Sequence, residues 1–307
     1  MIHIACNIDH NYVRYCGVTL VSLFESNRGE EFTAHIMARG LDDADRDVLR
    51  SLARRYGHTV LFHEPDGHLL DGFTIRATHG RLSTAAYYRC FLPDILPAKV
   101  DRVLYLDCDI VVRGSIAPLW ATPLDARTAV AAVEDMGCGE VARYDRLHYP
   151  QADSYFNSGV LLVNLAYWRE HGVAQACMDY YRRYPERIVF NDQDLLNCVL
   201  HDRKRLLDVK WNVQDGFYRT SVGDAWRKEH AEALRHPVVL HFTNRKPWSY
   251  DSQHPLRAEF FKYWALTPWS AERPWATLPA RLKRFFRLLP FRIGARKPKY
   301  IRMDALP

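Results

Sequence analysis

The chain has 307 residues, 48% of them hydrophobic, and a net charge of +6. This length allows one large α/β domain with appendages or two domains, and no apolar run reaches the roughly 18 residues that a membrane-spanning helix needs. The seven cysteines are scattered without a C-x-x-C pair, which excludes a zinc knuckle and a disulfide framework and favours the reducing cytoplasm.

The first half of the chain alternates strand and helix patterns. Residues 2–6 read as a strand that begins at once, without the features of a signal peptide. Residues 32–38 and 59–63 are further strands, and helices are predicted over 12–25 and 42–56, the second capped by Asp42. This βαβαβ order is typical of a doubly wound, mostly parallel sheet, which binds ligands beyond its strand ends.

The second half continues with shorter elements. A short helix after Ser83 or Thr84 is expected to stop at Pro93, and one helix is expected over 166–184. Strands are predicted over 103–106, 129–133, 160–165 and 237–242, and a shorter helix over 191–200.

The most informative motif is Asp107-Cys108-Asp109, which follows the apolar run 103–106. Two carboxylates at the carboxyl end of a buried strand attract a hard divalent cation such as Mg²⁺ or Mn²⁺, which in turn binds phosphate. Cys108 points to the opposite side of the chain and is interpreted as a core residue. Of the three other Asp-x-Asp pairs, the two within residues 43–47 read as the solvated first turn of a helix, and the third, Asp192-Gln193-Asp194, lies in the segment that opens the shorter helix predicted over 191–200.

His241 is the best candidate for a third metal ligand, because it directly follows the apolar run 238–240 near the end of the predicted strand. The alternative is a hydrogen-bonded residue at a strand end. Arg245 and Lys246 follow as cations that suit phosphates, and Trp248 offers a flat surface that suits a sugar.

Five segments in order resemble the retaining glycosyltransferases of family 8, which include bacterial lipopolysaccharide galactosyl- and glucosyltransferases. The segments are 8–12, 105–109, 156–160, 191–194 and His241 with 246–248. The resemblance covers roughly residues 2–250. It implies a GT-A type, Rossmann-like nucleotide-binding domain over residues 1–250, with a mostly parallel central sheet, followed by a basic, aromatic C-terminal extension over 251–307.

The resemblance also implies which residues bind the donor. Asp9 and Asn11 would hold uracil and ribose, although they could instead form an Asx turn and cap a helix. Asp107, Asp109 and His241 would hold Mn²⁺ or Mg²⁺, and the carboxylate of Asp107 would also reach the ribose.

Two further residues would lie at the diphosphate. His79 would lie near it or near the sugar edge, and Lys246 would clamp it. The family usually has Gly where this chain has Asn244, and the interval from His241 to Lys246 is one residue shorter than usual. Arg245 could therefore share the role of Lys246.

The same resemblance assigns another group of residues to the reacting sugar of the donor. Arg89 and Asp192 would contact its hydroxyls, with a helix cap as the alternative for Asp192. Gln193 would lie under the anomeric carbon, and Asp194 could carry the sugar covalently in place of a same-face attack. Asn157 is a further donor-binding candidate, or it supports the bend before its strand.

The C-terminal tail is basic and aromatic. Residues 281–307 contain nine lysines or arginines and one acid, so residues 1–280 carry a net charge of −2. Leucines and phenylalanines among these cations suit an anionic membrane surface; the alternatives are a nucleic-acid patch and an ordinary exposed helix. Pro290 is expected to limit any helix here to about three turns.

The sequence therefore predicts a cytoplasmic transferase at the inner face of the membrane. It would move glucose or galactose from a UDP-hexose to an oligosaccharide or lipid-linked glycan, such as a lipopolysaccharide precursor. Two alternatives remain. A phosphatase of the haloacid dehalogenase type also has an Asp-x-Asp motif, but Lys228 stands where its downstream ligand is needed. A non-catalytic relative would bind the nucleotide or glycan without turnover.

Overall fold

The computed structural model describes residues 1–74, 84–272 and 277–306. The chain divides into two compact units. The first consists of Met1–Val13, Gly29–Cys108 and Ile116–Asp208, and the second of Arg14–Arg28, Asp109–Ser115 and Val209–Pro307. This division differs from the boundary at residue 250 expected from the sequence, which stays a prediction.

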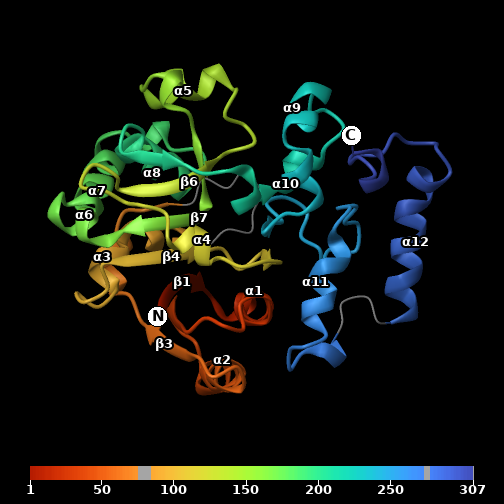
Figure 1. Ribbon diagram of the computed structural model, residues 1–307, viewed down its shortest axis with the longest axis horizontal. Helices are drawn as coiled ribbons and strands as arrows, with labels where there is room; N and C mark the ends of the chain where they lie inside the picture. Colours follow the sequence, from red (N-terminus) through yellow and green to blue (C-terminus); the bar gives the residue numbers. More distant parts are fainter. Residues whose placement is uncertain (75–83, 273–276, 307) are drawn as a thin grey trace. The chain divides into compact units, whose positions relative to one another are not determined.

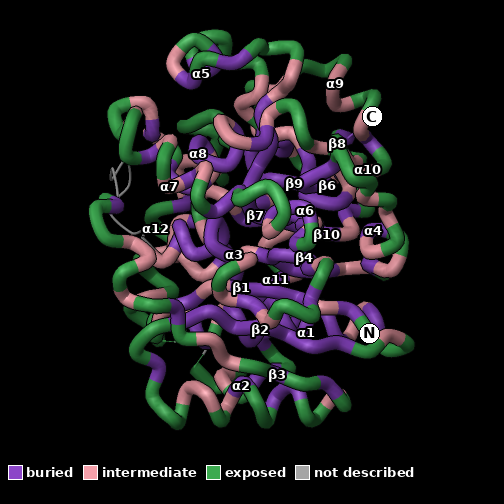
Figure 2. The backbone as a smooth tube through the Cα atoms, turned by 90° about the vertical axis from the view of Figure 1, so that its left-hand side faces the viewer, coloured by how far each residue is buried: buried purple, intermediate pink, exposed green. Residues whose placement is uncertain are grey.

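The first unit is built on a seven-stranded sheet of order β3-β2-β1-β4-β7-β6-β8. Its strands are β1 (Ile2–Ile8), β2 (Phe32–Ala38), β3 (Thr59–His63), β4 (Arg102–Leu106), β6 (Val130–Glu134), β7 (Phe156–Asn164) and β8 (Lys204–Leu206). Strand β7 runs antiparallel to β4 and β6, whereas the other neighbours are parallel. The central strands are largely buried (purple in Figure 2), as expected for apolar strands covered on both faces.

Helices flank this sheet. Figure 1 shows α6, α7 and α8 beside β6, β7 and β4, and α8 packs on β7 while α6 packs on β4. The helices of the unit are α2 (Asp43–Arg55), α3 (Leu92–Ile95), α4 (Ala117–Trp120), α5 (Val141–Leu147), α6 (Leu165–Glu170), α7 (Val173–Arg183) and α8 (Asn191–Leu200), with 3₁₀ helices η1 (His10–Tyr12), η2 (Gly67–Leu70), η3 (Thr84–Phe91), η4 (Gln151–Asp153) and η5 (Pro185–Arg187).

Two helix predictions are wrong and one is confirmed in detail. Pro93 does not stop a helix but lies in the first turn of α3, where its missing N–H is tolerated. The expected helix over 166–184 is two helices, separated at Gly172, whose φ of 59° is left-handed. Asp42 caps α2 as predicted, because its carboxylate accepts the N–H of Asp45 at 2.8 Å.

The second unit contains a small sheet of order β5-β10-β9. Its strands are β5 (Ile110–Val112), β9 (Val213–Gln214) and β10 (Val239–His241), so the predicted strand over 237–242 belongs to this sheet. Most of helix α1 (Val13–Ser26) belongs to this unit. The hydroxyls of its Thr19 and Ser26 donate to the carbonyls of Ile110 and Val112, each at 2.9 Å. These two carbonyls of the edge strand β5 therefore have hydrogen-bond partners.

The remaining helices of this unit lie in its C-terminal part. They are α9 (Asp224–Glu229), α10 (Ala231–Arg235), α11 (Arg257–Trp264) and α12 (Leu278–Arg292), with η6 (Val209–Trp211), η7 (Asp215–Tyr218), η8 (Ser270–Glu272) and η9 (Met303–Ala305). Helix α12 continues through Pro290 to Arg292, so it is longer than the three turns expected from the sequence. Within the described ranges, every helix is too short or too polar to span a bilayer.

Three histidine side chains on neighbouring strands of the main sheet lie in a row. Nδ1 of His3 lies 3.0 Å from Nε2 of His35, and Nδ1 of His35 lies 2.9 Å from Nε2 of His63. The three residues belong to β1, β2 and β3. Burial lowers the pKa of His35 to about 4 and also lowers the pKa values of His3 and His63.

The buried imidazole of His35 should make the stability of the fold depend on pH. Its folded pKa lies below the unfolded value of 6.5, so the unfolded chain binds the proton first as the pH falls. We expect its contribution to be complete above pH 6.5 and to be lost toward pH 4, by about 3 kcal/mol. Urea unfolding between pH 7.5 and 4.5 should show a flatter profile for His35→Gln. The same change at exposed His236 should keep the wild-type slope, and equal slopes for all three proteins would contradict the prediction.

Candidate active site

A buried arginine organises the polar residues of the first unit. The guanidinium of Arg89, on η3, donates to Oδ1 of Asp107 at 2.7 Å and lies 3.1 Å from Oδ2 of Asp192. It also donates to the carbonyl of Ser158 at 2.7 Å and lies over the ring of Tyr105. One cation therefore neutralises two carboxylates, one after β4 and one in the first turn of α8.

The carboxyl group of Asp192 has a raised pKa. Burial raises its pKa to about 6, because the loss of hydration outweighs the attraction of Arg89. Its carboxylate also accepts the hydroxyl of Ser158 at 2.9 Å. Phe190, and not Asp192, occupies the N-cap position of α8, so the alternative reading of Asp192 as a helix cap is wrong.

The side-chain amide of Gln193 is held in one orientation. Its Oε1 accepts the N–H of Ser158 and the side-chain amide of Asn157, both at 3.0 Å. Its Nε2 donates to Oδ2 of Asp135 at 3.1 Å. Asp135, which sequence reasoning missed, follows strand β6 and also accepts from Arg143 at 3.1 Å. Its position after a buried strand was the one signal that could have found it.

Asp194 is enclosed by donors. Its side chain is fully buried and accepts the hydroxyl of Tyr155, the guanidinium of Arg146 and the N–H groups of Val189 and Phe190, each at 2.7 Å. A carboxylate whose lone pairs are engaged by this many donors is a poor nucleophile. The geometry favours a structural role for Asp194 at the start of α8 over the covalent role considered from the sequence.

The predicted nucleotide-binding residues lie after neighbouring parallel strands. Asp9 follows β1 and Asp107 follows β4, and these strands pair in parallel, so both carboxylates are at one edge of the sheet. Asp9 occupies the N-cap position of η1, but its side chain makes no capping hydrogen bond, and its buried Oδ1 has no hydrogen-bond partner among the described residues. Asn11 is exposed on η1. His79 lies outside the described residues.

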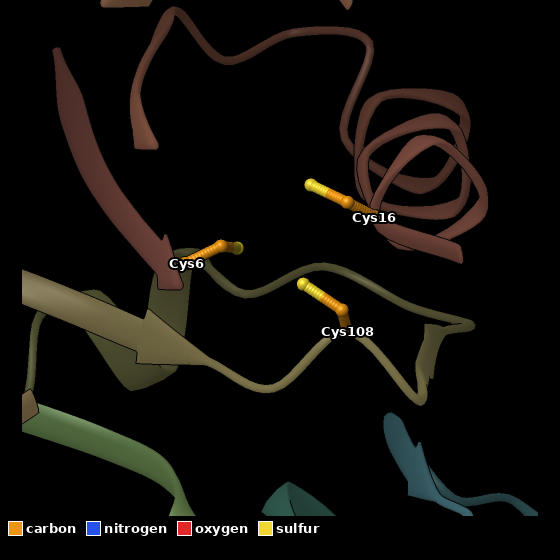
Figure 3. Close-up of side chains that lie close together, drawn as sticks. All are labelled: Cys6, Cys16 and Cys108. Atoms are coloured by element: carbon orange, nitrogen blue, oxygen red, sulfur yellow. The ribbon is translucent and has the colours of Figure 1, made fainter. Parts of the chain in front are cut away.

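Cys108, between the two aspartates, is buried as predicted. Its thiol donates weakly to the carbonyl of Asn7 at 3.9 Å. Figure 3 shows its side chain in the loop after β4, and that of Cys6 on β1. The burial of Cys108 supports the interpretation of a core residue.

The second unit brings Asp109 and His241 together. Asp109 immediately precedes β5 and His241 is the last residue of β10, two strands that pair antiparallel, and Nε2 of His241 lies 3.1 Å from Oδ1 of Asp109. Nδ1 of His241 lies 2.9 Å from Oδ1 of Asn212. An amide oxygen only accepts, so Nδ1 carries the hydrogen, and Nε2 of the neutral ring presents a lone pair to Asp109.

This arrangement fits a metal ion. Asp109 Oδ1 is buried without a hydrogen-bond partner in the described part of the chain, and it faces the lone pair of His241. Two buried acceptors this close require a proton or a cation between them. A carboxylate, an imidazole and a partner that fixes the imidazole tautomer are a common donor set for divalent metals. Asn212 carries no recognisable motif, and sequence reasoning missed it.

Lys246 lies beside the same carboxylate. Its ammonium group contacts Oδ2 of Asp109 and donates to the carbonyl of Phe242 at 2.8 Å. Burial alone would raise the pKa of Asp109, but the positive charge of Lys246 holds it below its ordinary value. Arg245 is exposed and lies 3.8 Å from Asp251, so of the two predicted cations Lys246 is the one next to Asp109.

Trp248 is not an open shelf for sugars. Its ring is stacked on Tyr15 with centroids 3.7 Å apart, and both residues belong to the second unit. One face of the indole is therefore covered by the protein.

The sequence profile of glycosyl transferase family 8 matches residues 3–252. The chain belongs to this family. General stress protein A of Bacillus subtilis is 30% identical over 278 residues, which cover 88% of this glycosyltransferase and 95% of that protein. The lipopolysaccharide glucosyltransferase WaaO of Escherichia coli is 28% identical over 277 residues, 87% of this chain and 78% of that protein.

A solved structure of the galactosyltransferase LgtC, in complex with donor and acceptor sugar analogues, is also similar. It aligns at 25% identity with a TM-score of 0.77 and covers 88% of this chain and 100% of its own. The predicted GT-A type α/β fold with a mostly parallel central sheet is confirmed. Family membership also removes the phosphatase alternative.

Proposed function

We propose that this chain is a retaining, metal-dependent transferase that moves glucose or galactose from a UDP-hexose to a glycan, such as a lipopolysaccharide precursor. The observation that carries the proposal is the buried pair of acceptors formed by Asp109 and His241. The named activities of WaaO and LgtC support hexose transfer and the two candidate sugars.

Asp107, Asp109 and His241 would hold Mn²⁺ or Mg²⁺. Asp107 is two residues before Asp109, so covalent geometry keeps their Cα atoms within about 7 Å. The bound ion would supply Lewis-acid stabilisation of the departing UDP diphosphate. Asn212 keeps the lone pair of His241 directed at this position, and Lys246 adds a positive charge that can move from Asp109 to a phosphate.

Residues of the first unit would position the donor. Asp9 would bind the uracil or ribose with Oδ1, which has no partner within the described ranges, and Arg89 and Asp192 would contact sugar hydroxyls. The carbonyl of Gln193 is already engaged by Ser158 and Asn157, which makes it a poor nucleophile. We therefore favour same-face attack by the acceptor hydroxyl, whose proton passes to the leaving phosphate oxygen.

The direct test uses the purified full chain with UDP-glucose, UDP-galactose and their N-acetyl forms. Calorimetry should show UDP binding in the presence of Mn²⁺, and EDTA should abolish it. One of the hexoses should release UDP faster when a glycan acceptor is added, and proton NMR should show the donor's anomeric configuration in the product. Absence of UDP binding would contradict the proposal, whereas binding without release would favour the non-catalytic alternative.

Helix α12 supports a second part of the proposal, attachment to an anionic membrane at its cytoplasmic face. Its exposed apolar residues share one face at helical spacing, namely Leu278, Leu282, Phe285, Phe286 and, just beyond its end, Ile293. Cations flank this face at Arg281, Lys283, Arg287 and Arg292. Leu288 is buried and Arg284 donates to the carbonyl of Ser252, so the opposite face packs on the second unit.

Vesicle binding should depend on the apolar face of α12. We expect Leu282→Ser/Phe286→Ser to weaken binding to phosphatidylglycerol vesicles by at least about tenfold, because two apolar side chains no longer enter the interface. Binding of the wild type should also weaken in high salt. Leu61→Ser, at an exposed leucine of β3, serves as the control and should bind like the wild type. Co-sedimentation with vesicles measures the binding of the wild type, the double variant and the control. Unchanged binding of the double variant would contradict this part of the proposal.

A further inference from the structure

A buried aspartate connects the loop that carries Lys246 to the C-terminal end of the chain. Asp215 is 1% exposed. Its Oδ1 accepts the side-chain amide of Asn244 at 2.7 Å and also the hydroxyl of Thr243. Its Oδ2 accepts the hydroxyl of Tyr300 at 2.9 Å. All four residues belong to the second unit, so these contacts lie within one compact body.

The C-terminal segment is held in place by its own backbone. The N–H of Ile301 donates to the carbonyl of Tyr218 at 2.9 Å, and the N–H of Thr220 donates to the carbonyl of Lys299 at 3.1 Å. Arg219 and Tyr300 form an antiparallel bridge between these bonds. The segment therefore adds a short strand-like pairing that delivers the Tyr300 side chain, 8% exposed, to Asp215.

Asn244 stands where the family usually has glycine, and the structure explains this departure. Its side chain donates to Asp215, which satisfies the buried carboxylate. The loop from His241 to Lys246 is thereby held at two consecutive residues, Thr243 and Asn244. A loop held in its binding conformation loses less conformational entropy when a ligand binds.

We propose that Tyr300, acting through Asp215, is a positioning residue for the diphosphate-binding loop 243–246, so that the C-terminal segment contributes to donor binding. This inference rests on the proposed function, because the ligand of the loop is the diphosphate of the UDP-sugar. It assigns a role to a residue outside the matched family region, which ends at residue 252. Tyr300 does not touch the donor in this proposal.

The test compares two tyrosine-to-phenylalanine variants of the full chain. Tyr300→Phe removes the hydrogen bond to Asp215 but keeps the buried ring. Tyr218→Phe is the matched control, because its hydroxyl donates to the carbonyl of Leu234, also at 2.9 Å, and does not contact Asp215. Calorimetry with UDP and Mn²⁺ measures affinity, and hydrogen exchange of the peptide 242–248 measures the order of the loop in the free protein.

We expect Tyr300→Phe to weaken UDP binding about fivefold to tenfold and to speed exchange in the loop. The KM for the donor should rise while kcat changes less than twofold, and Asn244→Ala should behave alike. Tyr218→Phe should leave UDP affinity and loop exchange unchanged. Wild-type values for Tyr300→Phe, or equal effects of both variants, would overturn the inference. If the wild type binds no UDP, the proposed function fails, and loop exchange still tests whether Tyr300 orders the loop.

Discussion

Replacing Asp109 with asparagine is expected to lower hexose transfer by about 10³-fold, which corresponds to about 4 kcal/mol of transition-state stabilisation. The substitution keeps the shape of the side chain but removes the charge that faces His241 and Lys246. An amide is a weak ligand for Mn²⁺ compared with a carboxylate, so the ion would be lost or misplaced. Initial rates of UDP release with Mn²⁺ measure the effect.

The matched control for Asp109 is Asp224→Asn, the same change at an exposed carboxylate of the second unit. It should transfer hexose like the wild type. A thermal melt of each variant separates loss of the site from loss of the fold, since Asp109→Asn also leaves Lys246 without its carboxylate partner. A rate for Asp109→Asn within tenfold of the wild type would show that this carboxylate does not hold the metal.

Replacing Arg89 with methionine is expected to lower the free energy of unfolding by roughly 3–5 kcal/mol, the usual cost of leaving a buried charge unpaired. The Arg89 side chain is 7% exposed, and its guanidinium is the shared partner of Asp107 and Asp192. Methionine fills a similar volume but supplies no donor to these carboxylates or to the carbonyl of Ser158. Urea unfolding at pH 8 measures the loss.

Two further variants make the Arg89 result specific. Arg89→Met/Asp192→Asn should recover part of the lost stability, because one of the two unpaired carboxylates becomes neutral. Arg50→Met should change the unfolding free energy by less than about 0.5 kcal/mol, because the pair of Arg50 with Asp47 is exposed on α2. A loss for Arg89→Met as small as that for Arg50→Met would contradict the buried-charge account.

Several elements of the fold could be predicted from local patterns. Strands β2 and β3 agree with the sequence residue for residue, and Asp42 caps α2 as its position indicates. These features depend on residues within one turn or one strand, so periodicity and capping rules suffice. The break at Gly172 could not be predicted from the local pattern. A glycine within a helical pattern either continues the helix or ends it, and tertiary packing decides between the two.

The sequence alone determined which chemistry the chain carries, since Asp107, Asp109 and His241 lie at the ends of apolar strands. The tertiary structure decided which partner each of these side chains has. Asn212 directs His241, and donors from distant segments enclose Asp194. The physical reason is that a hydrogen bond acts over about 3 Å, whereas these partners are 29, 48 and 39 residues apart along the chain, a separation that no local pattern encodes.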